Sequence, residues 1–199
     1  MRLIYNIEME NQAIQNLDLI QKMIMTAQRR FADNSNFYLL WGISVSLACI
    51  IQYILINLQN PYNSIGWLVI IPIALVLQVL FLIKKKKTEK VRTHIESLMG
   101  KMWIAFGISL GIVLSFASHL RENTFPIVLC LYAISVFIAG GALQLKSLYV
   151  GALCCWALAI VSFFVSIETQ LLLLAAAVIV AYVIPGIIIK SAYRNNQDV

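Results

Sequence analysis

Long apolar runs separated by short polar stretches fill the chain from residue 37 to residue 189. The six runs lie at residues 37–57, 64–83, 101–118, 125–143, 148–167 and 170–189. A helix of such a length, rising about 1.5 Å per residue, crosses a hydrocarbon core of about 30 Å. The pattern therefore predicts an all-α, polytopic integral membrane protein with six transmembrane helices.

The polar links between the runs restrict how the helices pair. The link at residues 58–63, which contains Pro61, joins the first two runs, and a link at residues 144–147 precedes the fifth. Helices joined by so few residues are antiparallel neighbours. The sequence predicts three antiparallel hairpins in a transmembrane domain at 37–190, followed by a polar cytoplasmic tail at 191–199.

The segment before the first run has a different pattern. Apolar residues recur there at steps of three and four, with polar residues between them: Ile14, Leu17, Ile20, Ile24, Ala27 and Phe31. One apolar stripe on a helix is the result. Residues 1–36 are therefore predicted to form an amphipathic cytoplasmic helix and its linker. We favour docking on the bundle or binding at the lipid interface over recognition of a partner helix.

The amino-acid composition also indicates a protein that lies in a lipid bilayer. Of the 199 residues, 61% are hydrophobic and only 12% are charged. A chain of this kind cannot bury its apolar surface in one soluble core. The net charge of +6 does not point to nucleic acid, because the basic residues cluster beside the apolar runs, where they set orientation.

The positions of lysine and arginine predict which side faces the cytoplasm. Fourteen of these 15 residues fall on the side of the termini, and Arg121 alone falls on the other. By the positive-inside rule both termini are expected in the cytoplasm. Anionic lipid headgroups are the expected partner on that side, and the residues expected to face them are Arg29, Arg30, Lys84, Lys85, Lys86 and Lys87.

Small residues mark one face of the third run. Gly107, Gly111 and Ser115 stand one turn apart, so another helix can approach closely there. We favour a contact within the chain over a dimer seam. In either case, the third helix is expected to lie inside the protein rather than face lipid.

The second helix of every hairpin contains residues that disturb helical geometry. Proline removes one backbone hydrogen bond and crowds the preceding turn. Structural kinks are the favoured interpretation, and hinges around a ligand site are the alternative. The kink candidates are Pro72, Gly140, Gly141, Pro185 and Gly186.

Three glutamines are the main polar candidates at membrane depth. Gln52, Gln78 and Gln144 need hydrogen-bond partners there, and bonds across helices are favoured over contacts with a ligand. The middle of each run has no Asp, Glu, Lys or Arg. The usual basis for a proton relay or an ion-coupled pump is therefore missing.

We find no residue combination for catalysis, cofactor binding or metal binding. The cysteines lie inside apolar runs, and the two histidines, His94 and His119, fall on opposite predicted sides. A nucleophile needs a base within hydrogen-bond reach. An enzyme is therefore not expected, and the four cysteines are interpreted as packed side chains: Cys49, Cys130, Cys154 and Cys155.

Three phrases carry a family resemblance: 36–42 (NFYLLWG), 103–109 (WIAFGIS) and 184–186 (IPG). Together they resemble a family of small, uncharacterised six-span proteins of the bacterial inner membrane, over about residues 13–190. The resemblance implies that location and six spans. It assigns no activity, and no functional residues are carried over.

Two functions from different classes remain open. One is a non-enzymatic membrane protein that acts by helix–helix association or by cytoplasmic docking of a partner or anionic lipid. The other is a small transporter or channel with a path between the disturbed second, fourth and sixth helices. A continuous polar cavity lined by Gln52, Gln78 or Gln144 favours transport, whereas a dry bundle favours association.

Overall fold

The computed structural model describes residues 2–33, 35–85 and 94–195, and the regular elements in these ranges are all helices. A 32-residue helix, α1 (Arg2–Asp33), comes first. The remaining elements are α2 (Ser35–Asn57), α3 (Ile65–Lys85), α4 (His94–Ser115), α5 (Ala117–Leu120), the short 3₁₀ helix η1 (Arg121–Asn123), α6 (Thr124–Leu143), α7 (Lys146–Ser162), α8 (Ile167–Val178), the π-helix η2 (Ile179–Val183) and α9 (Ile184–Asn195).

Five helical segments of the described chain are long and apolar enough to cross a membrane: Asn36–Asn57, Ile65–Ile83, Ser97–Ser115, Ala117–Leu143 and Ile167–Ile188. They confirm the all-α fold and indicate a multi-pass membrane protein. The fifth predicted run differs. Its helix, α7, has 17 residues, or about 25 Å at 1.5 Å per residue. It is shorter than expected because the chain turns at residues 163–166, where the sequence is still apolar.

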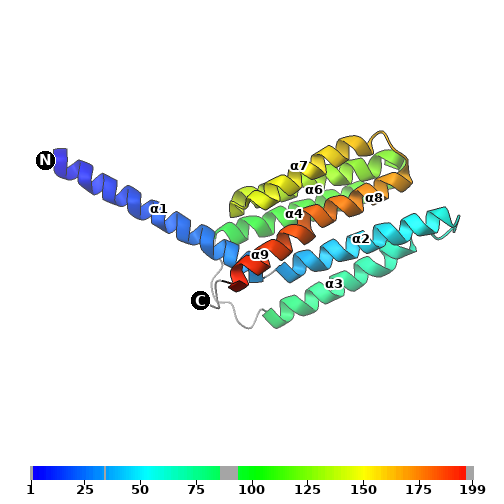
Figure 1. The fold of residues 1–199 in the computed structure, drawn as a ribbon, viewed down its shortest axis with the longest axis horizontal. Coiled ribbons are helices and arrows are strands. Elements are labelled where there is room, and N and C mark those ends of the chain that lie inside the picture. Colours follow the sequence, from blue (N-terminus) through cyan, green and yellow to red (C-terminus); the bar gives the residue numbers. More distant parts are fainter. Residues whose placement is uncertain (1, 34, 86–93, 196–199) are drawn as a thin grey trace.

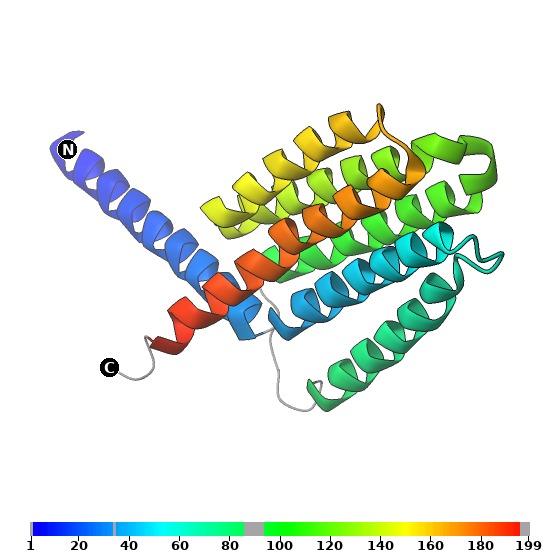
Figure 2. The same ribbon diagram turned by 45° about the vertical axis from the view of Figure 1, so that its right-hand side comes forward.

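The helices from α2 to α9 lie side by side in one bundle, and α1 projects from one end of it (Figure 1). The view in Figure 2 shows α3 on the outside of α2, with α8 and α9 following each other along the bundle. The helix α6 packs against α7, α4 and α8, while α2 packs between α3 and α8. Helices joined by short links, such as α2 with α3 and α6 with α7, are thus antiparallel neighbours.

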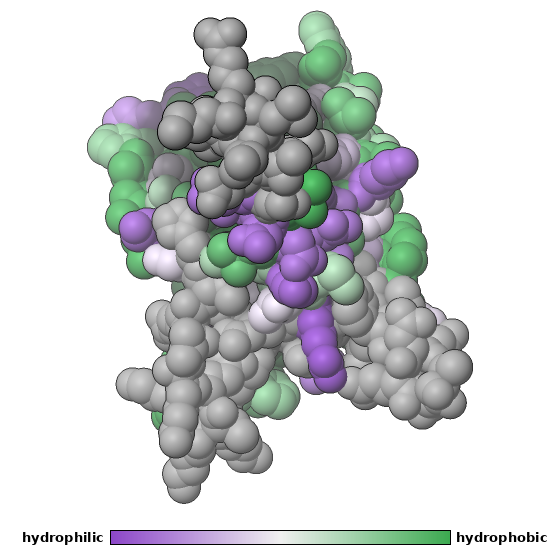
Figure 3. Space-filling model, turned by 90° about the vertical axis from the view of Figure 1, so that its left-hand side faces the viewer, coloured by the Kyte–Doolittle hydropathy of each residue, from purple (hydrophilic) through white to green (hydrophobic). Residues whose placement is uncertain are grey.

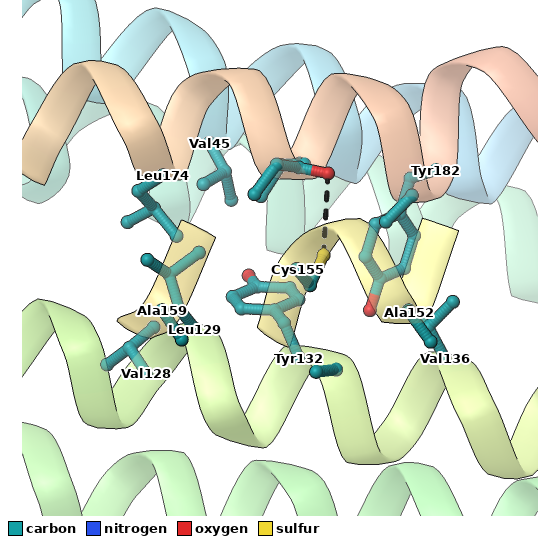
Figure 4. Packing of buried hydrophobic residues seen from close by; sticks show 14 of the residues in the cluster. Val45, Val128, Leu129, Tyr132, Val136, Ala152, Cys155, Ala159, Leu174 and Tyr182 are labelled. Atoms are coloured by element: carbon teal, nitrogen blue, oxygen red, sulfur yellow. Dashed lines mark hydrogen bonds between the residues drawn. The ribbon is translucent and has the colours of Figure 1, made fainter. Parts of the chain in front are cut away.

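The core lies between α6, α7, α8 and α2, where small side chains let the helices approach closely. Figure 4 shows Leu129 of α6, Ala152 and Cys155 of α7 and Leu174 of α8 in this contact. The thiol of Cys155 donates to the carbonyl oxygen of Ala177 at 3.7 Å. All four cysteines are free; Cys49 and Cys155 are buried, and the other two are half-buried.

Candidate functional site

Basic side chains collect at the bundle end from which α1 leaves. The first residues of α2, α4 and α7 and the last residues of α3 and α6 meet there (Figure 1). Figure 3 looks onto this end and shows hydrophilic residues gathered over it. Arg29, Lys101 and Lys146 are exposed on the elements that reach it. This end carries the described part of the cationic side that the sequence predicts.

Only part of the predicted headgroup-facing set lies where the structure describes side chains. Arg29 is exposed near the end of α1. Lys84 and Lys85 form the last residues of α3 and Arg30 belongs to α1, but the description covers their backbone alone. Lys86 and Lys87 lie outside the described residues.

The last turns of α1 are fastened to the bundle. Ala27 is 3% exposed, and the side-chain amide of Gln28 donates to the carbonyl oxygen of Leu143, at the end of α6, at 2.7 Å. The helix also contacts α9, α4 and α2. These contacts hold the base of α1 in place.

The middle of α1 lies beyond the bundle, with its apolar stripe open. Ile14, Leu17 and Ile20 are 58%, 65% and 53% exposed. On another face, Lys22 and Asp18 form an ion pair at 2.7 Å. A single helix in water is marginally stable, and packing of its apolar face normally provides most of its stability. The described residues of the bundle therefore leave the apolar stripe of α1 uncovered.

The α2–α3 hairpin uses two of the predicted polar residues. The indole N–H of Trp67 donates to Oε1 of Gln52 at 2.6 Å, and that of Trp41 donates to Oε1 of Gln78 at 2.8 Å. These are the bonds across helices that we expected of amides at membrane depth. Each joins two helices of the same hairpin, one pair near each end of it.

Gln144 departs from the prediction of a buried amide. It is exposed and follows α6 in the left-handed region, with φ 52°. The next residue, Leu145, donates its N–H to the carbonyl oxygen of Gly140 at 3.1 Å. Gln144 therefore belongs to the turn that ends α6, because the chain reverses there one residue after the apolar run.

The small-residue face of α4 is also placed differently from the prediction. Gly107, Gly111 and Ser115 are exposed, and a Cβ added at either glycine would meet nothing within 4 Å. Larger side chains of α4, including Trp103 and Phe106, pack against the core instead. Aromatic and aliphatic groups bury more area there than glycines can. The expectation that these small residues pack within one copy of the chain is wrong.

Three of the five kink candidates lie in continuous helices. Pro72 is exposed inside α3, and Gly140 and Gly141 lie inside α6. A Cβ on Gly140 would lie 3.2 Å from Cβ of Leu148 and 3.3 Å from the Tyr149 nitrogen. The physical role of Gly140 is thus close approach of α6 and α7 where the chain reverses.

The other two candidates, Pro185 and Gly186, closely follow a backbone irregularity. Proline cannot donate a hydrogen bond to the carbonyl four residues earlier, which is that of Ala181. The chain forms the π-helix η2 at this point, and Ile184 N–H bonds to the carbonyl oxygen of Ile179, five residues back. π-turns are rare and often lie at functional sites.

Two glycines on other helices contact this π-helix. A Cβ on Gly151 of α7 would lie 3.1 Å from Cα of Ala181, and one on Gly42 of α2 would lie 2.7 Å from Cγ2 of Val183. The widened turn therefore fits between α2 and α7 only because both positions lack a side chain. Sequence reasoning missed this contact, since no small-residue motif surrounds Gly151 and the phrase that ends at Gly42 carried no packing role.

An aromatic cluster joins the π-helix to α2, α4 and α6. Tyr182 lies with its ring centroid 5.6 Å from Tyr132 and 6.0 Å from Trp103. Tyr38 and Phe106 complete the cluster, at 5.9 Å from Trp103 and 5.0 Å from Tyr132. Such ring pairs stabilise packing beyond their buried area. Tyr38 and Trp103 thus pack between helices.

At the far end, Gln170 holds the turn between α7 and α8. Its side chain is 1% exposed, and its amide nitrogen donates to the carbonyl oxygens of Ser162 at 2.9 Å and Val165 at 3.1 Å. These bonds satisfy carbonyl groups left open where α7 ends. The sequence showed only a polar residue at the start of an apolar run.

The described residues contain no group of three His, Cys, Asp or Glu side chains placed to hold a metal ion. Comparisons of the chain with models of protein families, with curated proteins and with solved structures find no match. The resemblance noted from the sequence stays an expectation, and the site itself must carry the functional argument.

Proposed function

We propose that this chain is a non-enzymatic membrane protein of the bacterial inner membrane that acts by docking. Six spans hold α1 at the cytoplasmic face, where its apolar stripe enters the lipid interface and the basic side chains at that end of the bundle bind anionic lipid headgroups. The observation that carries this proposal is α1 itself, which is fastened at Gln28 and open from Ile14 to Ile20.

The proposal counts α7 as the sixth span. Its inner face buries Ala152, Cys155 and Ala159 against the core, while Val150 and Leu153 on its outer face are 59% and 58% exposed. An outward apolar face suits lipid rather than water. Local thinning of the bilayer accommodates a short helix at modest cost. An even number of spans also returns the chain to the α1 end, where α9 lies (Figure 1).

The apolar stripe of α1, together with the basic residues at the same end of the bundle, favours lipid over a protein partner. An interfacial helix needs an apolar stripe beside basic residues. Leu17 and Ile20 supply the stripe, and Arg29, Lys101 and Lys146 are exposed at the same end of the bundle. Each basic residue near an anionic surface contributes about 1 kcal/mol. A partner helix covering the same stripe is the competing outcome.

The transporter alternative has less support. Oε1 of Gln52 and Oε1 of Gln78 accept hydrogen bonds from indoles of the same hairpin, and Gln144 is in a turn. In the part of the chain that the structure describes, the three glutamines therefore do not line one common polar path. The cavity beside the aromatic cluster has room for about one water molecule.

A fluorescence measurement tests the docking proposal. The full chain with Leu17→Cys carries an environment-sensitive dye and is reconstituted in nanodiscs of zwitterionic lipid, with or without anionic lipid. Gln15→Cys, on the polar face, is the matched control, and the unsubstituted chain gives the background from its own cysteines. The expected result is a blue shift at Leu17 that grows with anionic lipid, with little change at Gln15.

Two results would count against lipid docking. If the dye at Leu17 stays in water in both kinds of nanodisc, the stripe does not dock on lipid. A blue shift already complete without anionic lipid, together with a cross-link from Leu17 to another polypeptide, assigns the stripe to a partner helix instead.

A further inference from the structure

The helix α3 is held to the rest of the bundle mainly by α2 and lies on the outside of it (Figure 2). Only 11% of its apolar span, Ile65–Ile83, is buried in the protein, against 56% of the span Ala117–Leu143, which contains α6. An apolar helix this open offers most of its surface to lipid or to another chain.

One face of α3 carries leucine at every seventh position. Leu68, Leu75 and Leu82 are 74%, 48% and 50% exposed. Ile71 and Gln78 each stand three residues after one of these leucines and four before the next, and both are half-buried. Alternating steps of three and four are the spacing with which two helices pair side by side. The face therefore has the pattern of a helix–helix contact with one polar side chain in it.

The side-chain amide of Gln78 has hydrogen-bonding capacity that the described chain leaves unused. Its Oε1 accepts a hydrogen bond from the indole N–H of Trp41 at 2.8 Å, and an amide oxygen has room for a second one. Its nitrogen carries two N–H groups and donates to no acceptor among the described residues. The half-buried side chain keeps this nitrogen at the protein surface, where a partner can reach it.

The depth of Gln78 removes the usual partners of a surface amide. Five residues, or about 7.5 Å along the helix axis, separate it from Ile83, where the apolar span ends. In a helix the Cα–Cβ bond is tilted toward the N-terminus, and the N-terminus of α3 lies at the opposite end from Lys84 and Lys85. The side chain thus leaves the backbone toward the bilayer centre, where hydrocarbon offers no acceptor and an N–H group without one is costly.

We propose that a second copy of this chain packs on this face of α3 and that the two Gln78 amides bond to each other across the contact. In a two-fold pair each nitrogen donates to the Oε1 of the other copy, so both missing acceptors are supplied at once. A lipid acyl chain covers leucine equally well but accepts no hydrogen bond. The amide therefore selects a protein chain over lipid, and it fixes the register of the two helices. This inference is independent of the docking proposed for α1.

Cysteine cross-linking of the full chain in its membrane tests the contact. Leu75→Cys places a thiol on the proposed face. Val76→Cys is the matched control, because Val76 is 59% exposed and its side chain is turned about 100° from that of Leu75. A mild oxidant is expected to give a disulfide-linked dimer with Leu75→Cys, well above the yield with Val76→Cys and above the background from the chain's own cysteines.

A second measurement tests the part played by the amide. Energy transfer between dye-labelled copies in liposomes, at several ratios of lipid to protein, gives the dissociation constant of the pair. Gln78→Leu is expected to raise this constant about tenfold or more, since two hydrogen bonds between copies are lost. The same variant loses the bond to Trp41, so Trp41→Phe is the control. It removes the bond within the hairpin, keeps the amide and should leave the dissociation constant almost unchanged.

Several results would overturn the proposal. Equal cross-linking at Leu75 and Val76 indicates random encounters, and a cross-link to a polypeptide of another mass assigns the face to a different partner. A chain that stays monomeric in liposomes at every ratio leaves the face to lipid. If Gln78→Leu pairs as tightly as the unsubstituted chain, or if Trp41→Phe loses as much, the amide does not join the copies.

Discussion

The indole nitrogen of Trp67 lies 2.6 Å from Oε1 of Gln52, on the paired helix of the same hairpin. Trp41 and Gln78 repeat the arrangement at 2.8 Å. In hydrocarbon neither an amide nor an indole N–H finds a water partner, so each needs the other. Two such bonds, one near each end, fix the register of α2 against α3, the outermost helix of the bundle.

Removing Gln52 is expected to weaken this hairpin. Gln52→Leu leaves the indole N–H of Trp67 without its acceptor and should lower the free energy of unfolding by about 0.6–1.7 kcal/mol. Equilibrium unfolding in mixed micelles measures the change. Trp67→Phe in the Gln52→Leu background should add little, because the bond is already lost. Equal, additive losses would argue that the two side chains act separately.

The glycine that contacts the π-helix should tolerate no side chain. Gly151→Ala places a Cβ 3.1 Å from Cα of Ala181 and is expected to lower the free energy of unfolding by about 1–3 kcal/mol. Gly107→Ala is the matched control on α4, where the added Cβ meets nothing within 4 Å. It should be neutral or stabilise the chain by up to about 1 kcal/mol. Equal effects at both sites would contradict the close contact between Gly151 and the π-helix η2.

A larger substitution at Gly107 tests the dimer seam, which is the second interpretation of the small-residue face of α4. Within one copy, the face of Gly107 and Gly111 is open, so any packing role there must involve another chain or lipid. If a bulky substitution, Gly107→Ile, changes the mass of the particle in detergent, that face joins copies. An unchanged mass with unchanged stability assigns it to lipid.

Gln170 should act as a fastener for the turn between α7 and α8. Gln170→Leu keeps the volume but leaves the carbonyl oxygens of Ser162 and Val165 without the amide donor. The expected loss is about 1–3 kcal/mol in the free energy of unfolding. Thr169→Val, at the exposed neighbouring position, should change it by less than about 0.5 kcal/mol. A neutral Gln170→Leu would show that solvent replaces both bonds.

The base of α1 should loosen when its hydrogen bond to the bundle is lost. Gln28→Ala removes the donor to the Leu143 carbonyl, and amides in the last turns of α1 should exchange with solvent up to about tenfold faster, since such a bond contributes about 0.5–1.5 kcal/mol. Hydrogen exchange by mass spectrometry measures this. Gln21→Ala, on the exposed part, should leave those turns unchanged. Matching profiles for both variants would mean that Gln28 is not the fastening point.

Hydrophobic patterning located the helices well because a bilayer rewards long apolar runs directly. The first predicted run, 37–57, lies within α2, and the fourth, 125–143, lies within α6. The pattern failed at the end of α7. Phe163 and Phe164 are as apolar as a span requires, yet they form the exposed part of a turn. Hydropathy does not distinguish a turn at the membrane surface from a continuing helix.

The contacts between helices were harder to predict than the helices. Gln52 and Gln78 were found because an amide in an apolar run demands a partner. Gly151 and Gly42 were missed because a glycine records only the absence of a side chain, and its meaning depends on the backbone of η2 beside it. Pro185 did point to the irregular turn, through its missing N–H. The sequence did not predict that the helix would widen into a π-turn there, because this depends on how η2 packs against α2 and α7.

The most direct test of the account is which side of the membrane each bundle end faces. Glu122 in η1 and Lys146 at the start of α7 are both exposed at opposite ends. A membrane-impermeant maleimide should label Glu122→Cys in intact cells, and Lys146→Cys only after permeabilisation, above the background of the unsubstituted chain. The reverse pattern, or a chain that stays monodisperse in buffer without detergent, would contradict a bundle that holds α1 at the cytoplasmic face.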